Sequence, residues 1–150
     1  MKKMSILIIM LGLTLRMYAP ADRVFYIPEP TKINPYERIW EAVCRIESMN
    51  DPDAYHLEEN GFASIGIAQI QQSRVDDYNR RTGNSYLLCD MFNPGIAKRV
   101  FMHYCGEYKP DQIEIIARLW NGGPNGMRYK QTYEYYLKIK SVYGKTSMSF

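Results

Sequence analysis

Residues 34–53 read NPYERIWEAVCRIESMNDPD and carry the start, the apolar stripe and the end of one amphipathic helix. Asn34 can serve as the N-cap, Pro35 suits the first turn, and Glu37 supplies the third-position carboxylate of a capping box. The apolar side chains that follow recur at helical spacing: Ile39, Trp40, Val43, Cys44 and Ile46. A proline and two aspartates then end the pattern, so the sequence predicts a helix over residues 35–48.

Glu47 lies on the apolar face of this predicted helix. It follows Trp40 by seven positions and Val43 by four, so its carboxyl group is expected to face the core. Burial disfavours the charged form of a carboxyl group and raises its pKa, and such a group can act as a general acid near neutral pH. Periodicity leaves a second interpretation open, in which Glu47 turns outward at the end of the helix.

Four further helices are predicted by capping residues and apolar spacing. One starts at Asn93 with a proline in its first turn, and another starts with a capping box at Asp111 and stops at the run NGGP. The other two cover residues 74–81, with Gly83 as the stop, and residues 132–143.

Residues 61–70 read GFASIGIAQI and lack a helical period. Their glycines and β-branched side chains predict a small strand pair or an irregular loop. The expected fold is therefore a single α+β domain that is predominantly α-helical and has a small β-hairpin or loop element.

Residues 1–21 have the layout of a signal peptide. Two lysines precede an apolar run over residues 4–15, and small residues follow it. The run is shorter than the roughly 20 apolar residues that a membrane span needs, so we expect a removed export signal and no permanent membrane span. Cleavage is expected after Ala19 or after Ala21, and the protein is expected in the periplasm or outside the cell.

The length and the charge fit one exported domain. The chain has 150 residues, which leaves room for one domain, and we expect a lead over residues 22–34 followed by the domain over residues 35–150. The formal net charge is +3, but the expected signal peptide holds three basic residues and no acidic one, so its removal leaves the two signs equal. Without a basic stripe that interleaves with aromatic residues, no nucleic-acid partner is expected.

The cysteines and histidines do not predict a metal or cofactor site. Cys89 and Cys105 could form a disulfide in an exported protein, while the alternative is that the cysteines, including Cys44, are buried free thiols. The two histidines lack the spacing of zinc ligands, and no phosphate-binding loop is present in the sequence. We expect no cofactor.

Four segments, in this order, resemble the soluble lytic transglycosylase family of lysozyme-like enzymes. They are RIES at 45–48, NDPDA at 50–54, SIGIAQI at 64–70 and IARLWNGGP at 116–124. The resemblance extends from about residue 35 to residue 143 and implies a lysozyme-like fold. Each motif is weak alone, but four in the right order are fairly specific.

The resemblance also implies the roles of individual residues. Glu47 falls on the family's catalytic acid/base, and Gly66 would allow a close backbone approach because glycine has no Cβ. Trp120 replaces the family's tyrosine, which removes a hydroxyl group, and Ala68 replaces its methionine, which changes the cleft floor. The implied substrate-binding residues are Ser48, Gln69, Trp120, Asn121 and Tyr135.

The implied activity is cleavage of peptidoglycan glycan strands between N-acetylmuramic acid and N-acetylglucosamine. Glu47 would protonate the glycosidic oxygen and then deprotonate the sugar's 6-hydroxyl group, which closes a 1,6-anhydro ring without water or a cofactor. Such an enzyme suits cell-wall remodelling, or a secretion, conjugation or phage assembly that must open the wall.

Two alternatives remain open at the level of sequence. A lysozyme-type hydrolase would need a second carboxylate, for which Asp51, Asp53, Glu58 and Glu59 are the candidates. A non-catalytic module that binds the cell wall would keep the fold and lose the turnover, and the tryptophan at position 120 is its best support.

Overall fold

The computed structural model describes residues 34–59 and 61–145, so the expected signal peptide and all but the last residue of the expected lead lie outside the described residues. The described residues form five α-helices, three short strands and two 3-10 helices. This content confirms the predicted α+β, predominantly helical class. In chain order the elements are α1 (Glu37–Ser48), β1 (Tyr55–Leu57), β2 (Ala63–Ile65), β3 (Ile70–Gln71), α2 (Gln72–Thr82), η1 (Leu88–Phe92), α3 (Pro94–Cys105), α4 (Ile113–Gly122), η2 (Gly123–Arg128) and α5 (Lys130–Lys145).

All five predicted helices are present, and the stop signals fall where the sequence places them. The Asn93 side chain accepts hydrogen bonds from the N–H groups of Gly95 and Ile96, as an N-cap should. Gly83 ends α2 with a φ of 72°, in the left-handed region that glycine adopts readily.

The predicted capping boxes at the starts of α1 and α4 are wrong. The side chain of Asn34 accepts the Tyr36 N–H at 3.0 Å, so it caps a turn before α1 and the helix begins only at Glu37. The helix α4 begins at Ile113, because the side chain of Gln112 accepts the Lys109 N–H at 2.9 Å and closes a separate turn first.

The strands form one antiparallel sheet in the order β1-β2-β3. Ile65 is paired with Tyr55 on one side and with Ile70 on the other. Strand β2 lies within residues 61–70, the segment predicted as a strand pair or loop, and β3 begins at its last residue and extends one residue beyond it, whereas β1 was not predicted. Its three residues are too few to establish a period, and all three side chains are exposed.

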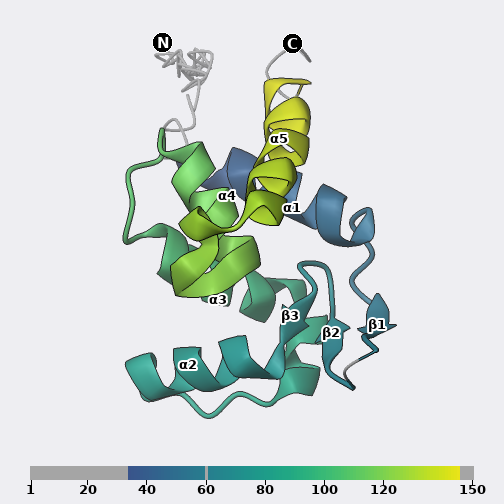
Figure 1. Cartoon of the computed structure of the whole chain (residues 1–150). Helices are drawn as coiled ribbons and strands as arrows, with labels where there is room; N and C mark the ends of the chain where they lie inside the picture. The colour runs from purple at the N-terminus through teal and green to yellow at the C-terminus, as the bar shows by residue number, and fades with distance from the viewer. Residues whose placement is uncertain (1–33, 60, 146–150) are drawn as a thin grey trace, which may run out of the picture. The chain divides into compact units, whose positions relative to one another are not determined.

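The core is built where α1, α3, α4 and α5 meet. The ring of Phe101 lies 5.3 Å from that of Trp40 and 5.0 Å from that of Trp120, so one aromatic cluster joins α1, α3 and α4. Helix α5 packs against both α1 and α4 and contributes the fully buried Ile139. Figure 1 shows α1, α4 and α5 grouped together, with α2 lying beside the sheet.

All three cysteines lie within the described residues and are free thiols. The Cys89–Cys105 disulfide is therefore not formed. Cys44 and Cys105 are buried, as the alternative interpretation requires, while Cys89 is exposed. Among the described helices, none combines the length and the apolar character that crossing a membrane demands.

Candidate active site

Glu47 lies in the last turn of α1 and points toward α5. Its Oε1 atom accepts a hydrogen bond of 2.7 Å from the Tyr135 hydroxyl group. Tyr135 is buried in α5, and the packing of α5 against α1 brings the two side chains together. Glu47 therefore faces the protein, which agrees with the apolar spacing around it in the sequence.

The surroundings of Glu47 favour its protonated form. Burial raises the pKa of Glu47, while the Tyr135 hydroxyl group and the positive charge of Lys138 lower it by smaller amounts. Burial and the negative charge of Glu47 raise the pKa of Tyr135 well above its usual range, so this phenol stays protonated and donates. A carboxyl group that holds its proton to an unusually high pH is suited to general acid catalysis.

Glu47 opens into a polar cleft of about 420 Å³ that lies between the helical part of the structure and the sheet. Four of the six predicted site residues line this cleft: Glu47 from α1, Gln69 from the loop between β2 and β3, and Trp120 and Asn121 from α4. The full lining is Glu47, His56, Glu58, Ser64, Gln69, Ile70, Gln71, Ser73, Arg74, Trp120 and Asn121.

Ser48 and Tyr135 do not line this cleft. Tyr135 acts on the cleft through its hydrogen bond to Glu47. The Ser48 hydroxyl group donates to the Ile67 carbonyl oxygen at 2.8 Å and accepts the Asp51 N–H at 3.1 Å. Ser48 therefore ties the end of α1 to the loop that joins β2 and β3.

Gln69 and Gly66 shape that same loop. Gln69 lines the cleft with a φ of 47°, and its amide Nε2 donates to the Gly66 carbonyl oxygen at 3.0 Å. Gly66 has a φ of 72°, and a Cβ there would come within 2.1 Å of the Met91 carbonyl oxygen. The close backbone approach expected at Gly66 is thus made to the 3-10 helix η1.

Trp120 forms the wall between the cleft and the core. Its side chain is buried, and its carbonyl oxygen accepts a hydrogen bond of 2.7 Å from Arg74 Nη2. Trp120 has no hydroxyl group, and the hydroxyl donor to Glu47 is Tyr135 on another helix. Asn121, the next residue, is exposed at the cleft.

Comparison with known proteins identifies the family. No family model matches the chain, and no solved structure matches it. Over 102 residues the chain is 30% identical to a protein named lysozyme from Magallana gigas, and the match covers 65% of this chain and 73% of that protein. The chain belongs to the lysozyme-like family. The narrower resemblance to soluble lytic transglycosylases stays a prediction.

The lysozyme-like cleft also contains Glu58, one of the four acidic residues predicted as candidates for a second carboxylate. Glu58 follows β1, and its Oε1 atom accepts a hydrogen bond of 3.0 Å from Gln71 Nε2. The other three candidates, Asp51, Asp53 and Glu59, do not line the cleft. Glu58 therefore supplies a second carboxylate, held in place by the sheet.

Arg74 and His56 are cleft residues that sequence reasoning missed. Arg74 is a charged residue within an amphipathic helix, and His56 lies in the exposed strand β1. Neither has a local signal, because only the tertiary arrangement of α2, the sheet and α4 places them at the cleft. Within residues 34–59 and 61–145, no three His, Cys, Asp or Glu side chains are grouped as metal ligands.

Proposed function

We propose that this lysozyme-like protein cleaves peptidoglycan glycan strands at the β-1,4 bond between N-acetylmuramic acid and N-acetylglucosamine, with Glu47 as the general acid. The observation that carries the proposal is the Glu47 carboxyl group, which lies in a polar cleft with its pKa raised by burial and its position held by Tyr135. The proposal includes export to the cell wall, as residues 1–21 predict.

The reaction that best fits a single carboxyl group with a raised pKa is that of a lytic transglycosylase. Protonated Glu47 gives its proton to the glycosidic oxygen, and the bond to the muramic acid breaks. The resulting carboxylate then takes the proton of that sugar's own 6-hydroxyl group, and the 6-oxygen closes the 1,6-anhydro ring. The Tyr135 hydroxyl group stabilises the carboxylate between these two steps, because it donates to the charged form.

Hydrolysis is the second candidate, and Glu58 favours it. A glycosidase that uses water needs a second carboxylate, either to activate the water or to attack the sugar. Glu58 lines the cleft together with Glu47, and Gln71 fixes one of its oxygen atoms. The similarity to a protein named lysozyme agrees with this candidate as well.

Mass spectrometry of digested peptidoglycan tests the proposal. We expect the wild-type chain to release anhydro-muropeptides and Glu47→Gln to release none. The matched control is Glu41→Gln, which makes the same change at an exposed position of the same helix. Wild-type protein without soluble product, or a Glu47→Gln variant with full activity, would contradict the proposal.

The same spectra separate the two reactions. A hydrolase product carries a reducing end and is heavier than the anhydro product by one water. Under the transglycosylase proposal, Glu58→Gln still releases the anhydro product. If Glu58 activates water, the wild type releases reducing ends, and Glu58→Gln loses them by roughly a hundredfold or more.

A further inference from the structure

A second, smaller pocket of about 140 Å³ adjoins the cleft. Arg74 and Trp120 line both cavities, so the two are separated by no more than these side chains. The pocket is lined by residues of α2, α3, α4 and η2. Its walls are mainly apolar, with Ile116, Leu119 and Pro124 on the side of α4 and η2.

Arg74 is a partly buried cation in the wall of this pocket. Its guanidinium group lies 4.6 Å from the ring centre of Tyr104 and 4.8 Å from that of Trp120. Its Nη2 atom donates to the Trp120 carbonyl oxygen, and burial lowers its pKa. Within the described part of the chain, no carboxylate oxygen lies within 4.0 Å of this guanidinium group, although buried charges in proteins are normally paired.

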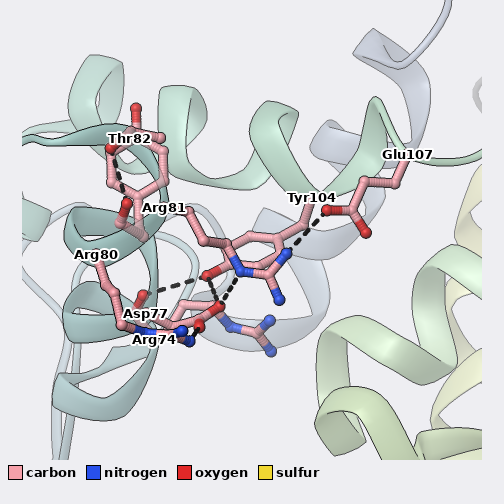
Figure 2. Close-up of polar contacts among 8 residues, drawn as sticks. Arg74, Asp77, Arg80, Arg81, Thr82, Tyr104 and Glu107 are labelled. Carbon is pink, nitrogen blue, oxygen red and sulfur yellow. Dashed lines mark hydrogen bonds and ion pairs between the residues drawn. The ribbon is translucent and has the colours of Figure 1, made fainter.

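The acidic side chains of the pocket are already engaged by other partners. Asp77 accepts a hydrogen bond of 2.7 Å from the Tyr104 hydroxyl group, and its carboxylate also pairs with Arg80 and Arg81. Glu107 pairs with Arg81 at 3.0 Å. Figure 2 shows the contacts of Tyr104, Arg80 and Arg81 with Asp77 and the contact of Arg81 with Glu107. The Arg74 guanidinium group, which forms no ion pair within 4.0 Å and is attracted by Asp77 only from a longer distance, therefore faces a cavity large enough for a small anionic group.

We propose that this pocket binds a carboxylate of the peptide that peptidoglycan carries on its muramic acid, with Arg74 as the ion-pair partner. The inference rests on the proposed function, because the ligand is a side branch of the same substrate. Because Arg74 and Trp120 line both cavities, a sugar bound in the cleft would lie next to the pocket, and its peptide branch would have to pass these two side chains to enter it. The apolar walls suit the methyl and methylene groups of such a peptide, and the pairing of Arg81 with Asp77 and Glu107 offsets the negative charge of these two carboxylates.

Binding of a free peptide tests this inference without catalysis. The probe is a synthetic muramyl tetrapeptide with free carboxylates, and its control is the same peptide with every carboxylate amidated. Calorimetry with the full chain should give a dissociation constant about tenfold lower for the acidic peptide, as one charge-assisted hydrogen bond would produce. Equal affinity for the two peptides would overturn the inference, and this comparison needs only the wild-type protein.

Two variants locate the peptide. Arg74→Gln should weaken binding of the acidic peptide about tenfold and leave the amidated peptide unaffected. Arg80→Gln is the matched control, because Arg80 also pairs with Asp77 but does not line the pocket. An equal loss in both variants would contradict the assignment to Arg74. Circular dichroism checks that each variant is folded. If Arg74→Gln does not fold, the comparison of the acidic and amidated peptides on the wild-type protein decides whether the pocket binds a carboxylate.

Kinetics then distinguish a failure of this inference from a failure of the proposed function. The wild type should cleave peptide-bearing strands with a KM about tenfold lower than strands from which the peptides were removed, and Arg74→Gln should reduce that difference. Cleavage of peptide-bearing and peptide-free strands with equal KM overturns the inference that the pocket binds the peptide and leaves the glycosidase proposal intact. Selective binding of the acidic peptide without cleavage of any strand supports the pocket and overturns the glycosidase proposal.

Discussion

Tyr135 lies 88 residues after Glu47 in the chain, and its hydroxyl group donates a hydrogen bond of 2.7 Å to the Glu47 carboxyl group. The contact forms because α5 packs against α1, and both side chains lie where the two helices meet. Burial raises the pKa of Glu47, and the hydroxyl group opposes part of that rise. Burial thus keeps the Glu47 carboxyl group protonated to a higher pH, and the Tyr135 hydroxyl group provides a hydrogen bond for its charged form.

Removing the Tyr135 hydroxyl group should move the pH dependence of activity. Tyr135→Phe deletes a donor that favours the charged carboxylate, so the pKa of Glu47 should rise further. We expect the limb of the kcat/KM profile that reports Glu47 to shift to higher pH, and the free energy of unfolding to fall by about 1–2 kcal/mol. Tyr133→Phe, at a more exposed position of α5, is the control and should leave the profile in place. A profile that is the same in wild type and Tyr135→Phe would contradict this account.

Glu47 should lower the stability of the fold as the pH rises. Because its pKa is raised in the folded state, the folded chain holds more protons than the unfolded chain at pH values above about 4.5, the ordinary value. The free energy of unfolding therefore falls as the pH rises from there toward the folded-state pKa. Glu47→Gln removes this loss, so the variant should be more stable than the wild type at pH 7 and should lose that advantage at pH 4. Thermal unfolding at several pH values measures the difference in stability between the variant and the wild type. A variant that is less stable than the wild type at pH 7 would contradict this prediction.

Local sequence signals predicted much of the helical framework but less of the site. Asn93 caps the start of α3 and Gly83 caps the end of α2, as predicted, because helix capping depends only on a few neighbouring residues. Apolar spacing also placed Glu47 on the inner face of its helix. The capping box at Asp111 was wrong because a neighbouring glutamine closes a separate turn, an alternative that the sequence pattern does not rank.

Partners that are distant in sequence could not be predicted from such signals. The hydrogen bond between Tyr135 and Glu47 and the place of Glu58 at the cleft depend on how α5 and the sheet pack. The same is true of Arg74, whose sequence context is that of any charged helical residue. The family resemblance named Tyr135 as a site residue, but it did not indicate that Tyr135 donates a hydrogen bond to Glu47 from outside the cleft lining.

The cysteines should differ sharply in reactivity. Burial raises the pKa of Cys44 to about 12 and raises that of Cys105 as well, so neither forms much of the reactive thiolate at neutral pH. Cys89 is exposed. A disulfide reagent that reports free thiols should therefore titrate one thiol rapidly in the native chain and three after denaturation. Cys89→Ser should abolish the rapid phase, and a rapid phase that persists in this variant would contradict the burial of the other two.

Gly66 should tolerate substitution poorly, because its backbone approaches η1. A Cβ at this position would come within 2.1 Å of the Met91 carbonyl oxygen, and the φ of 72° adds strain for any residue other than glycine. We expect Gly66→Ala to lower the free energy of unfolding by about 2–4 kcal/mol, and to reduce activity because the loop also carries Gln69 into the cleft.

Gly61 provides the matched control for this prediction. Its φ of 82° is also in the left-handed region, but a Cβ there would have no atom within 4 Å. Gly61→Ala should therefore cost only the backbone strain, about 1 kcal/mol. Chemical denaturation of both variants measures the difference between them. A larger loss of stability for Gly66→Ala assigns the excess to the close contact between the Gly66 loop and η1. Equal losses in the two variants would contradict this account and show that the backbone conformation alone requires glycine at position 66.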